Sequence, residues 1–387
     1  IVGTTAAVFA GLFLISTVLG LMTRSAQNAA TANYNASKGA LGDLITLITS
    51  GLRDTKGIEI ATVQKVLSLV DQTIQKVQAV NGGDPELSNI RAEMLYQGAK
   101  MFQKKQDLAD AINAANESFA ILSQVTGYEI RTSHPAAFAA VPAIRRWDLV
   151  LSIELLGDLL RQQKKYADAR KRFVDAIEVN NLLVTEFPDN DNWAQGVSQL
   201  YTRVGDIDVM TSLVEAENDY QGSMTISARY FARKPNDESW QRELAGPYAK
   251  LSDVSQRKGD ADGNVDSRKT SYSIALDYLG NSLCLRRQVA VSNLAKTEYT
   301  RDVSYTLDRV GVLHERLSYP VGTELAYFES LRIRRGLAAS VSDNALYLGD
   351  VALSLSLIAD HYLALGNLQS ALAFYDAAAD ARDAIIK

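Results

Sequence analysis

The chain carries apolar stripes at helical spacing, separated by short polar breaks, and residues 151–179 show the pattern most clearly. Small and large apolar residues share one face of each of two helical runs: Ile153, Leu156, Gly157 and Leu160 in the first run, and Ala169, Phe173 and Ala176 in the second. Small positions opposite large ones let two helices approach closely. The stretch therefore predicts a packed helix hairpin.

A similar rhythm recurs downstream. An aromatic residue is followed twelve positions later by a small one in four pairs: Trp193 and Gly205, Trp240 and Ser252, Tyr299 and Gly311, Tyr347 and Ala359. The aromatic residues lie 47, 59 and 48 residues apart, and we attribute the long interval to a polar, turn-like stretch at 258–264. An α-solenoid of about six hairpins is predicted over 86–387, at roughly 88–125, 147–187, 193–234, 240–296, 299–341 and 347–387.

The second helix of each later hairpin has its own expected stripe. The apolar positions assigned to these stripes are Ala216 and Tyr220; Ile274, Leu276 and Leu279; Leu325, Phe328 and Leu331; and Ala371, Tyr375 and Ala378. The stripe that contains Ile274 is the least regular. The fold class expected from these patterns is all-α.

The first 22 residues are apolar and uncharged. About 20 helical residues cross a hydrocarbon core about 30 Å thick, so residues 1–22 predict a transmembrane helix that contacts the lipid bilayer. Gly3, Gly11 and Gly20 would suit association into a homo-oligomer. Residues 23–85 are expected to form a juxtamembrane helical hairpin and linker. Because the chain begins with Ile1, we expect a segment to precede it.

Basic residues are sparse after the apolar segment, with only Arg24 and Lys38 in the next sixteen positions. Cytoplasmic flanks of membrane helices are usually rich in Lys and Arg. The expected localisation is therefore a single-pass protein of the bacterial inner membrane with a periplasmic array.

Together the small and large positions of 151–179 resemble the tetratricopeptide repeat (TPR), in which Leu-Gly and an aromatic residue precede Ala, Phe and Ala. The breaks EFPDNDNW and ARKPNDESWQREL resemble the linkers of long-period TPR arrays in bacterial multidomain signalling and effector proteins. That resemblance implies a membrane-anchored sensing array behind an N-terminal effector. Tyr299 and Tyr347 depart from the linker Trp.

Composition removes several classes of function. A net charge of −5 argues against a nucleic-acid binder. The single cysteine, Cys284, excludes an intramolecular disulfide and a Cys-rich metal site. The three histidines, His134, His314 and His361, are far apart in sequence, and no phosphate loop or nucleophile turn is present. We expect no cofactor, no metal and no catalysis from this part of the chain.

Stacked hairpins usually hold a protein or peptide partner against the concave face that their first helices line. The positions expected on that face are Glu154, Asp158, Arg161, Gln162, Asp206, Asp253 and Asp360. The Asp residues of this set recur one per hairpin, which fits contacts within each hairpin better than a metal site. The expected function is a membrane-anchored TPR scaffold or sensor. The alternatives are an envelope assembly adaptor, or the non-catalytic part of an enzyme whose catalytic domain precedes Ile1.

Overall fold

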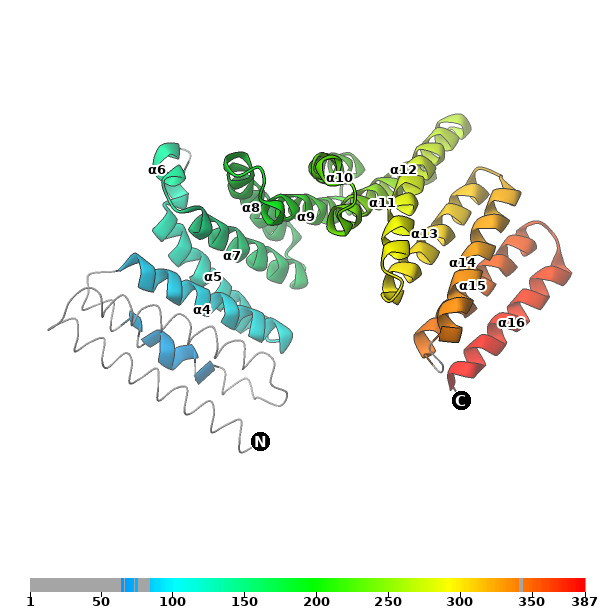
Figure 1. Ribbon diagram of the computed structural model, residues 1–387, viewed down its shortest axis with the longest axis horizontal. Helices are drawn as coiled ribbons and strands as arrows, with labels where there is room; N and C mark the ends of the chain where they lie inside the picture. The colour runs from blue at the N-terminus through cyan, green and yellow to red at the C-terminus, as the bar shows by residue number, and fades with distance from the viewer. Residues whose placement is uncertain are drawn as a thin grey trace. The chain divides into compact units, whose positions relative to one another are not determined.

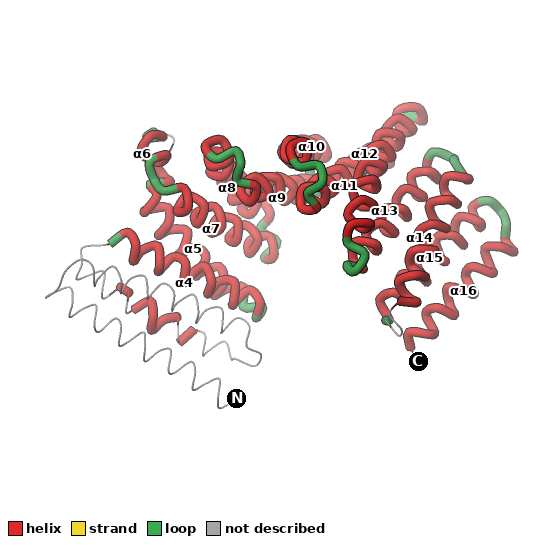
Figure 2. Tube along the Cα trace, viewed as in Figure 1, coloured by secondary structure: helices red, strands yellow, loops and turns green. Residues whose placement is uncertain are grey.

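The computed structural model describes residues 64–65, 67–72, 74–75, 84–131, 133–340 and 344–386. Throughout this part of the chain the regular elements are helices joined by short loops, and no strand is present (Figure 2). The predicted all-α repeat fold is confirmed for these residues. The predictions for 1–22 and for most of 23–85 lie outside them.

The chain divides into two compact units, Ile1–Trp193 and Ala194–Lys387, which we describe separately (Figure 1). The described helices of the first unit are α4 (Pro85–Lys104), α5 (Leu108–Thr126), η1 (Tyr128–Ile130), α6 (Pro135–Ala139), α7 (Ala143–Gln162) and α8 (Tyr166–Glu186). The second unit holds α9 (Asp191–Asp208, which begins at the boundary), α10 (Leu213–Arg233), α11 (Glu238–Ala261), α12 (Val265–Ser292), α13 (Thr297–Arg316), α14 (Pro320–Ser340), α15 (Ala345–Ala364) and α16 (Leu368–Ile386). Consecutive helices pair as hairpins.

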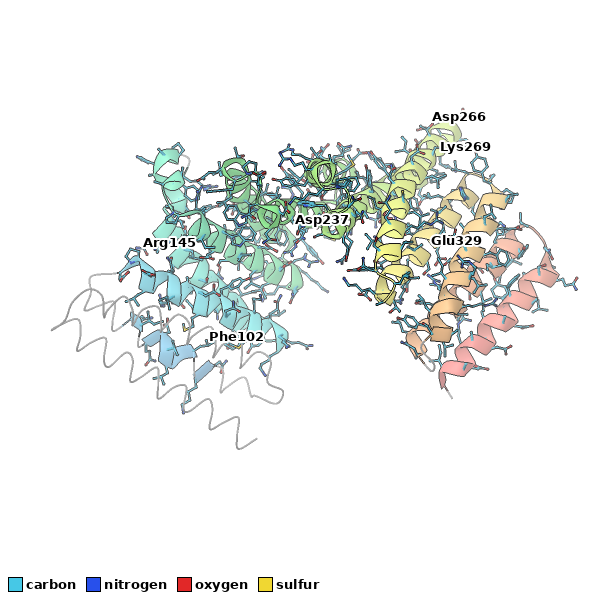
Figure 3. All side chains as sticks on the ribbon, viewed as in Figure 1. Phe102, Arg145, Asp237, Asp266, Lys269 and Glu329 are labelled. Carbon is cyan, nitrogen blue, oxygen red and sulfur yellow. The ribbon has the colours of Figure 1, made fainter. Side chains whose placement is uncertain are left out.

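Four hairpins share one turn geometry. In α4–α5, α7–α8, α13–α14 and α15–α16 the middle turn residue has a left-handed backbone: Gln106 (φ 64°), Lys164 (φ 61°), Ser318 (φ 60°) and Gly366 (φ 76°). The next residue donates its N–H to a carbonyl five positions earlier, at 2.8–2.9 Å, as in a Schellman ending. Side-chain caps start other helices, such as Asp237 before α11, labelled in Figure 3.

Close approach of a glycine and an aromatic ring holds the hairpins together. A Cβ added at Gly157 would lie 2.6 Å from the Phe173 ring, and one at Gly205 would lie 2.6 Å from the Tyr220 ring. Both rings are buried. This small-against-large packing is the arrangement that residues 151–179 predicted, and it gives the described helices the character of a TPR-type array.

The hairpin α11–α12 departs from the predicted register. The stretch expected to be a turn, 258–264, begins inside α11, and Gly259 takes the small position that was predicted for Ser252. A Cβ at Gly259 would lie 2.7 Å from the Tyr272 ring. The buried stripe of α12 is Tyr272, Ala275, Leu279 and Leu283, whereas Ile274 is exposed. The prediction was wrong because α11 runs two turns further than the aromatic-plus-twelve spacing allows.

The second helix of the next hairpin, α14, also differs from expectation. Leu325 and Phe328 were assigned to the buried stripe, but both are exposed. Tyr327 is buried and packs its ring on Gly311, and Leu331 is buried as predicted. In the buried stripe of α14, Tyr327 therefore takes the position that was assigned to Phe328.

The predicted localisation as a single-pass membrane protein is corrected by the structure. Among the described residues, no helix is both long enough and apolar enough to cross a bilayer. The longest, α12, has 28 residues but carries ionisable groups at both ends, including Asp266, Arg268 and Arg286. Charged side chains at membrane depth are costly. We do not retain the membrane localisation.

Candidate functional site

Polar side chains join the neighbouring first helices α9 and α11 in the second unit. Gln195 Nε2 donates to Ser239 Oγ at 2.7 Å, and Gln199 Nε2 donates to Glu243 Oε2 at 3.1 Å. Further along the same two helices, Lys250 Nζ lies 2.7 Å from Asp206 Oδ1. Each pair is separated by 44 residues, so the contacts form a row along two parallel helices.

The row continues from helix to helix within the second unit. Arg309 on α13 pairs with Asp253 on α11 and donates to the Ala249 carbonyl at 3.0 Å. On α15, the first helix of the following hairpin, Asp350 pairs with Arg301 of α13 and accepts a hydrogen bond from the Tyr305 hydroxyl at 2.8 Å. The face formed by first helices is therefore polar and internally paired over most of its length.

A hollow lies on this face, and two of the pairs just described, Gln195 with Ser239 and Gln199 with Glu243, are part of its lining. It has a volume of about 330 Å³. The residues that line it come from α9, α11, α12 and α13, and they are Gln195, Gln199, Ser239, Arg242, Glu243, Ala245, Arg286 and Asp302. Seven of these eight side chains can form hydrogen bonds or carry charge. The hollow is thus suited to a ligand that presents polar groups.

Two guanidinium groups in the hollow have spare hydrogen-bond donors. Arg286 donates only its Nε, to Ser282 Oγ at 3.2 Å, and its Nη1 lies 3.5 Å from Asp302, whose side chain is 56% exposed. Arg242 stacks over the Tyr299 ring at 4.8 Å and makes no hydrogen bond or ion pair with the described residues. Arginine presents five N–H donors, so both groups can take a further acceptor.

Burial shapes the charges of the hollow. It lowers the pKa of Arg286; Asp302 opposes the change, and Arg309 and Arg242 add to it. Burial also raises the pKa of Glu243, against hydrogen bonds from Gln199 and Ser198. The half-buried Arg286 therefore has two positive neighbours, Arg242 and Arg309, and its ion-pair partner Asp302 is largely exposed.

The middle of α11 has open space beside the backbone, one turn after two residues that line the hollow. Gly246 follows Arg242 and Glu243 by one helical turn, and a Cβ added there would meet no atom within 4 Å. Pro247, which has no N–H, cannot donate to the Glu243 carbonyl four residues earlier. That carbonyl is an additional acceptor on the same stretch of helix.

The seven residues predicted for the groove do not line this hollow. In the second unit, Asp206 accepts the Tyr220 hydroxyl at 2.8 Å as well as Lys250, Asp253 pairs with Arg309, and Asp360 accepts the Tyr375 hydroxyl. The remaining four lie on α7 in the first unit: Glu154 and Asp158, which are partly exposed, and Arg161 and Gln162, which are exposed. Asp158 lies 3.3 Å from Arg161.

Sequence reasoning missed the hollow because its residues lie one to three turns before the small residue used to align the hairpins. Gln195 and Gln199, one turn apart on α9, and the adjacent Arg242 and Glu243 on α11 were the available signals. Arg286 belongs to a second helix, where only the apolar stripe was considered. Aligning the first helices of the hairpins therefore gave no indication of Arg286.

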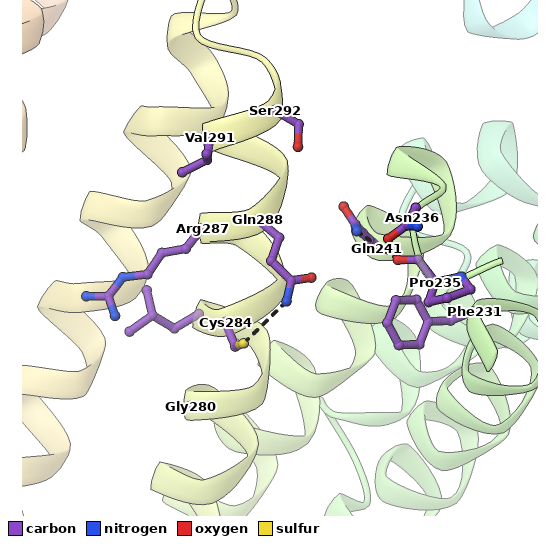
Figure 4. A pocket seen from close by; sticks show the side chains of 11 residues that line it. Phe231, Pro235, Asn236, Gln241, Gly280, Cys284, Arg287, Gln288, Val291 and Ser292 are labelled. Atoms are coloured by element: carbon purple, nitrogen blue, oxygen red, sulfur yellow. Dashed lines mark hydrogen bonds between the residues drawn. The ribbon is translucent and has the colours of Figure 1, made fainter.

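A second hollow of about 690 Å³ lies between the α10–α11 turn and the end of α12 (Figure 4). Its walls are largely apolar, with Phe231, Pro235 and Leu283 among them. Gln288 points into it and donates to Cys284 Sγ at 3.8 Å. Nothing charged faces its interior, since Arg287 points away and pairs with Glu329 on α14 at 2.7 Å, the residue labelled in Figure 3.

The first unit holds a small acidic recess on α4 and α7. Asp148 and Glu93 line it together with Asn89 and Tyr96. Burial, and then the charge of Glu93, raise the pKa of Asp148 to about 6. Over the described residues of both units, no three His, Cys, Asp or Glu side chains are grouped for a metal ion.

No protein family profile matches the sequence, and no curated protein matches it. Among solved structures, the chain is similar to BtubC (BKLC) from P. vanneervenii, with 15% identity over 72% of this chain and 90% of that one and a TM-score of 0.45. It is also similar to the apo form of RapI, with 14% identity over 84% and 94% and a TM-score of 0.40. A third is PilF of Pseudomonas aeruginosa, with 12% identity over 73% and 96% and a TM-score of 0.29.

The class of protein follows from the hairpins themselves. Gly157 on Phe173, Gly205 on Tyr220 and Gly259 on Tyr272 repeat one packing contact in successive hairpins. The described part of the chain is a helical repeat array, and the packing of its hairpins is consistent with that of tetratricopeptide repeats.

Proposed function

We propose that this chain is a protein-interaction scaffold that binds an extended peptide segment of a partner across α9, α11 and α13. The observation that carries the proposal is the polar hollow lined mainly by the first helices α9, α11 and α13, in which Arg242 and Arg286 keep spare hydrogen-bond donors. TPR-type arrays hold peptides and partner domains on their first helices.

The spacing of the amide groups suits a peptide main chain. Gln195 and Gln199 lie one helical turn apart, and a turn rises about 5.4 Å. Two residues of an extended peptide span about 6.6 Å, so successive main-chain groups on one edge could meet successive glutamine amides. Each amide offers both a donor and an acceptor, as a peptide backbone requires. Their present partners, Ser239 and Glu243, lie in the same hollow and would be released together.

A substitution at Gly246 tests the proposed peptide site directly. A Phe at this position meets open space in the free protein, so the fold should tolerate it, but the ring would occupy the ligand's place. Gly336 on α14 is a matched control, since an added Cβ there also meets nothing within 4 Å. Gly280, which lines the apolar hollow, has equally open surroundings and tests that hollow as an alternative site.

The probe is a phage-displayed library of random twelve-residue peptides, selected on the immobilised chain. We expect enriched peptides to bind the wild type and Gly336→Phe equally, and to lose at least tenfold in affinity for Gly246→Phe. Two results would overturn the proposal: no peptide is enriched, or the enriched peptides are blocked by Gly280→Phe and not by Gly246→Phe. Circular dichroism of each variant checks that the helices are intact.

A further inference from the structure

We infer that the hollow on α9, α11 and α13 selects a peptide with an acidic side chain, whose carboxylate binds between Arg286 and Arg242. This inference rests on the proposed function and adds the chemistry of the bound segment. The ligand group is the side-chain carboxylate of an aspartate or glutamate within an extended peptide.

The hydrogen-bonding state of the two arginines is the first argument. Within the described residues, Arg242 donates to no acceptor and Arg286 donates only its Nε, so the Nη groups of both line the hollow without a hydrogen bond, although Arg286 Nη1 lies 3.5 Å from Asp302. A guanidinium fork matches the two oxygens of a carboxylate, and such charge-assisted pairs are among the strongest hydrogen bonds in proteins. Arg301 and Arg309 on α13 form closer ion pairs, with Asp350 and with Asp253, than the 3.5 Å pair of Arg286 and Asp302.

The local charge is the second argument. Arg286 is half-buried and lies near Arg242 and Arg309. Within the described residues its one carboxylate partner is Asp302, which is 3.5 Å away and largely in solvent. Burial and the two arginines lower the pKa of Arg286, which means that its charged form is held at a cost. An incoming carboxylate relieves this cost, whereas a cationic side chain would add to it.

The lining also argues for a carboxylate over a phosphate. Glu243 and Asp302 belong to the same hollow and balance the two arginines in formal charge. A group with a single negative charge can be accommodated beside these two carboxylates more easily than a phosphoryl group with nearly two charges. The arrangement therefore favours Asp or Glu over a phosphorylated residue.

The experiment uses pools of nine-residue peptides, acetylated and amidated, in which every position except the centre is randomised over uncharged amino acids. The centre is Glu, Gln or phosphoserine, and a fourth pool has central Gln and a free C-terminal carboxylate. Affinity for the full chain is measured by fluorescence polarisation. We expect the Glu pool to bind about tenfold more tightly than the Gln pool, the difference that one charged hydrogen-bond pair supplies.

Variants assign this preference to its residues. Arg286→Gln should bring the Glu and Gln pools to equal affinity. Arg242 is exposed, and Arg242→Gln should reduce the ratio of Glu-pool to Gln-pool affinity at least threefold. The neighbouring Arg287→Gln removes the same charge from the same helix but lies on the side of Glu329, so the tenfold preference should persist.

The outcomes separate this inference from the proposed function. If all pools bind equally and Gly246→Phe blocks them, the peptide-binding function stands and the acidic preference is wrong. If phosphoserine or the free C-terminal carboxylate binds more tightly than Glu, the inferred ligand group is wrong. If no pool binds at all, the proposed function itself fails.

Discussion

The Tyr272 ring of α12 lies so close to Gly259 of α11 that an added Cβ would stand 2.7 Å from the Tyr272 Cε1. The ring is buried and its hydroxyl donates to Asp260 at 2.7 Å, so it cannot withdraw without losing that bond. Gly259 and Asp260 at the end of α11 thus fix the ring and the hydroxyl of Tyr272, respectively. The same pairing recurs where Tyr220 packs on Gly205 and donates to Asp206.

Gly259→Ala should therefore destabilise the second unit by about 1–3 kcal/mol, the usual cost of overpacking a core. Gly280→Ala on α12 is the control, because an added Cβ there meets nothing within 4 Å. It should stabilise the unit by up to about 1 kcal/mol through helix propensity. Thermal unfolding followed by circular dichroism measures both, and a Gly259→Ala variant as stable as wild type would contradict the packing argument.

The left-handed turn residues give a pair of predictions with opposite signs. Ser318 (φ 60°) holds a conformation that L residues with a Cβ adopt at a cost of about 1–2 kcal/mol, part of which glycine's extra entropy in the unfolded chain cancels. Ser318→Gly should raise stability by about 0.5 kcal/mol. Gly366→Ala, at φ 76°, should lower it by about 1 kcal/mol. Urea unfolding midpoints at constant slope report the difference, and equal signs would refute the turn geometry.

Asp148 should make the first unit less stable as pH rises. Its pKa is about 6 in the folded protein and near 3.8 unfolded, so the folded state binds more protons between these values. The stability that this group contributes is present in full below about pH 4 and is lost as pH rises to about 6. Asp148→Asn should stabilise the protein by about 1–2 kcal/mol at pH 7.5, after allowance for partial solvent screening, and hardly at all at pH 4.

Melting temperatures of wild type and Asp148→Asn across pH 4–8 test this. Glu93→Gln, which removes the neighbouring charge, should show a smaller gain over the same window. A constant difference between wild type and Asp148→Asn at all pH values would show that the carboxyl does not titrate as inferred.

The buried ion pair of Arg334 and Asp308 should depend strongly on both partners. Arg334 is fully buried on α14 and donates to Asp308 at 2.5 Å, to Ser304 at 3.1 Å and to Ser354 at 2.9 Å. Arg334→Met leaves a buried carboxylate without its cation and should cost about 3–5 kcal/mol. The double variant Arg334→Met, Asp308→Asn should recover part of that loss, and an additive result in this double-mutant cycle would contradict direct coupling.

Periodicity predicted the helical class, and the positions of small and large apolar residues supplied the resemblance to TPR packing. Gly157 and Phe173 were paired correctly since their hairpin has the common turn at Lys164. The register failed at Ser252 because α11 is longer than its neighbours, and no local signal distinguishes a helical Lys258–Gly259 from a turn. The proposed unit boundaries stay a prediction.

The hollow could not be predicted for a different reason. Whether Gln199 meets Glu243 depends on the relative register of two helices that are 44 residues apart in sequence, and apolar stripes do not specify the polar side of that register. Arg286 reaches the hollow from a second helix, and its sequence context of apolar and basic residues gave no indication of that. Asp206 pairs with Lys250 and Asp253 pairs with Arg309 across neighbouring hairpins, which the one-per-hairpin recurrence did not predict.

Apart from Ala245, which belongs to the apolar core, the residues that line the hollow are polar and are separate from the apolar residues that pack the hairpins. Gly205 and Tyr220 hold α9 on α10, while Gln195 and Gln199 stand on another face of α9 and contribute nothing to that contact. Recognition can therefore diverge in evolution while folding is conserved. Two descendants of this chain could keep every glycine and buried tyrosine and still serve different partners, after only a handful of changes on four helices.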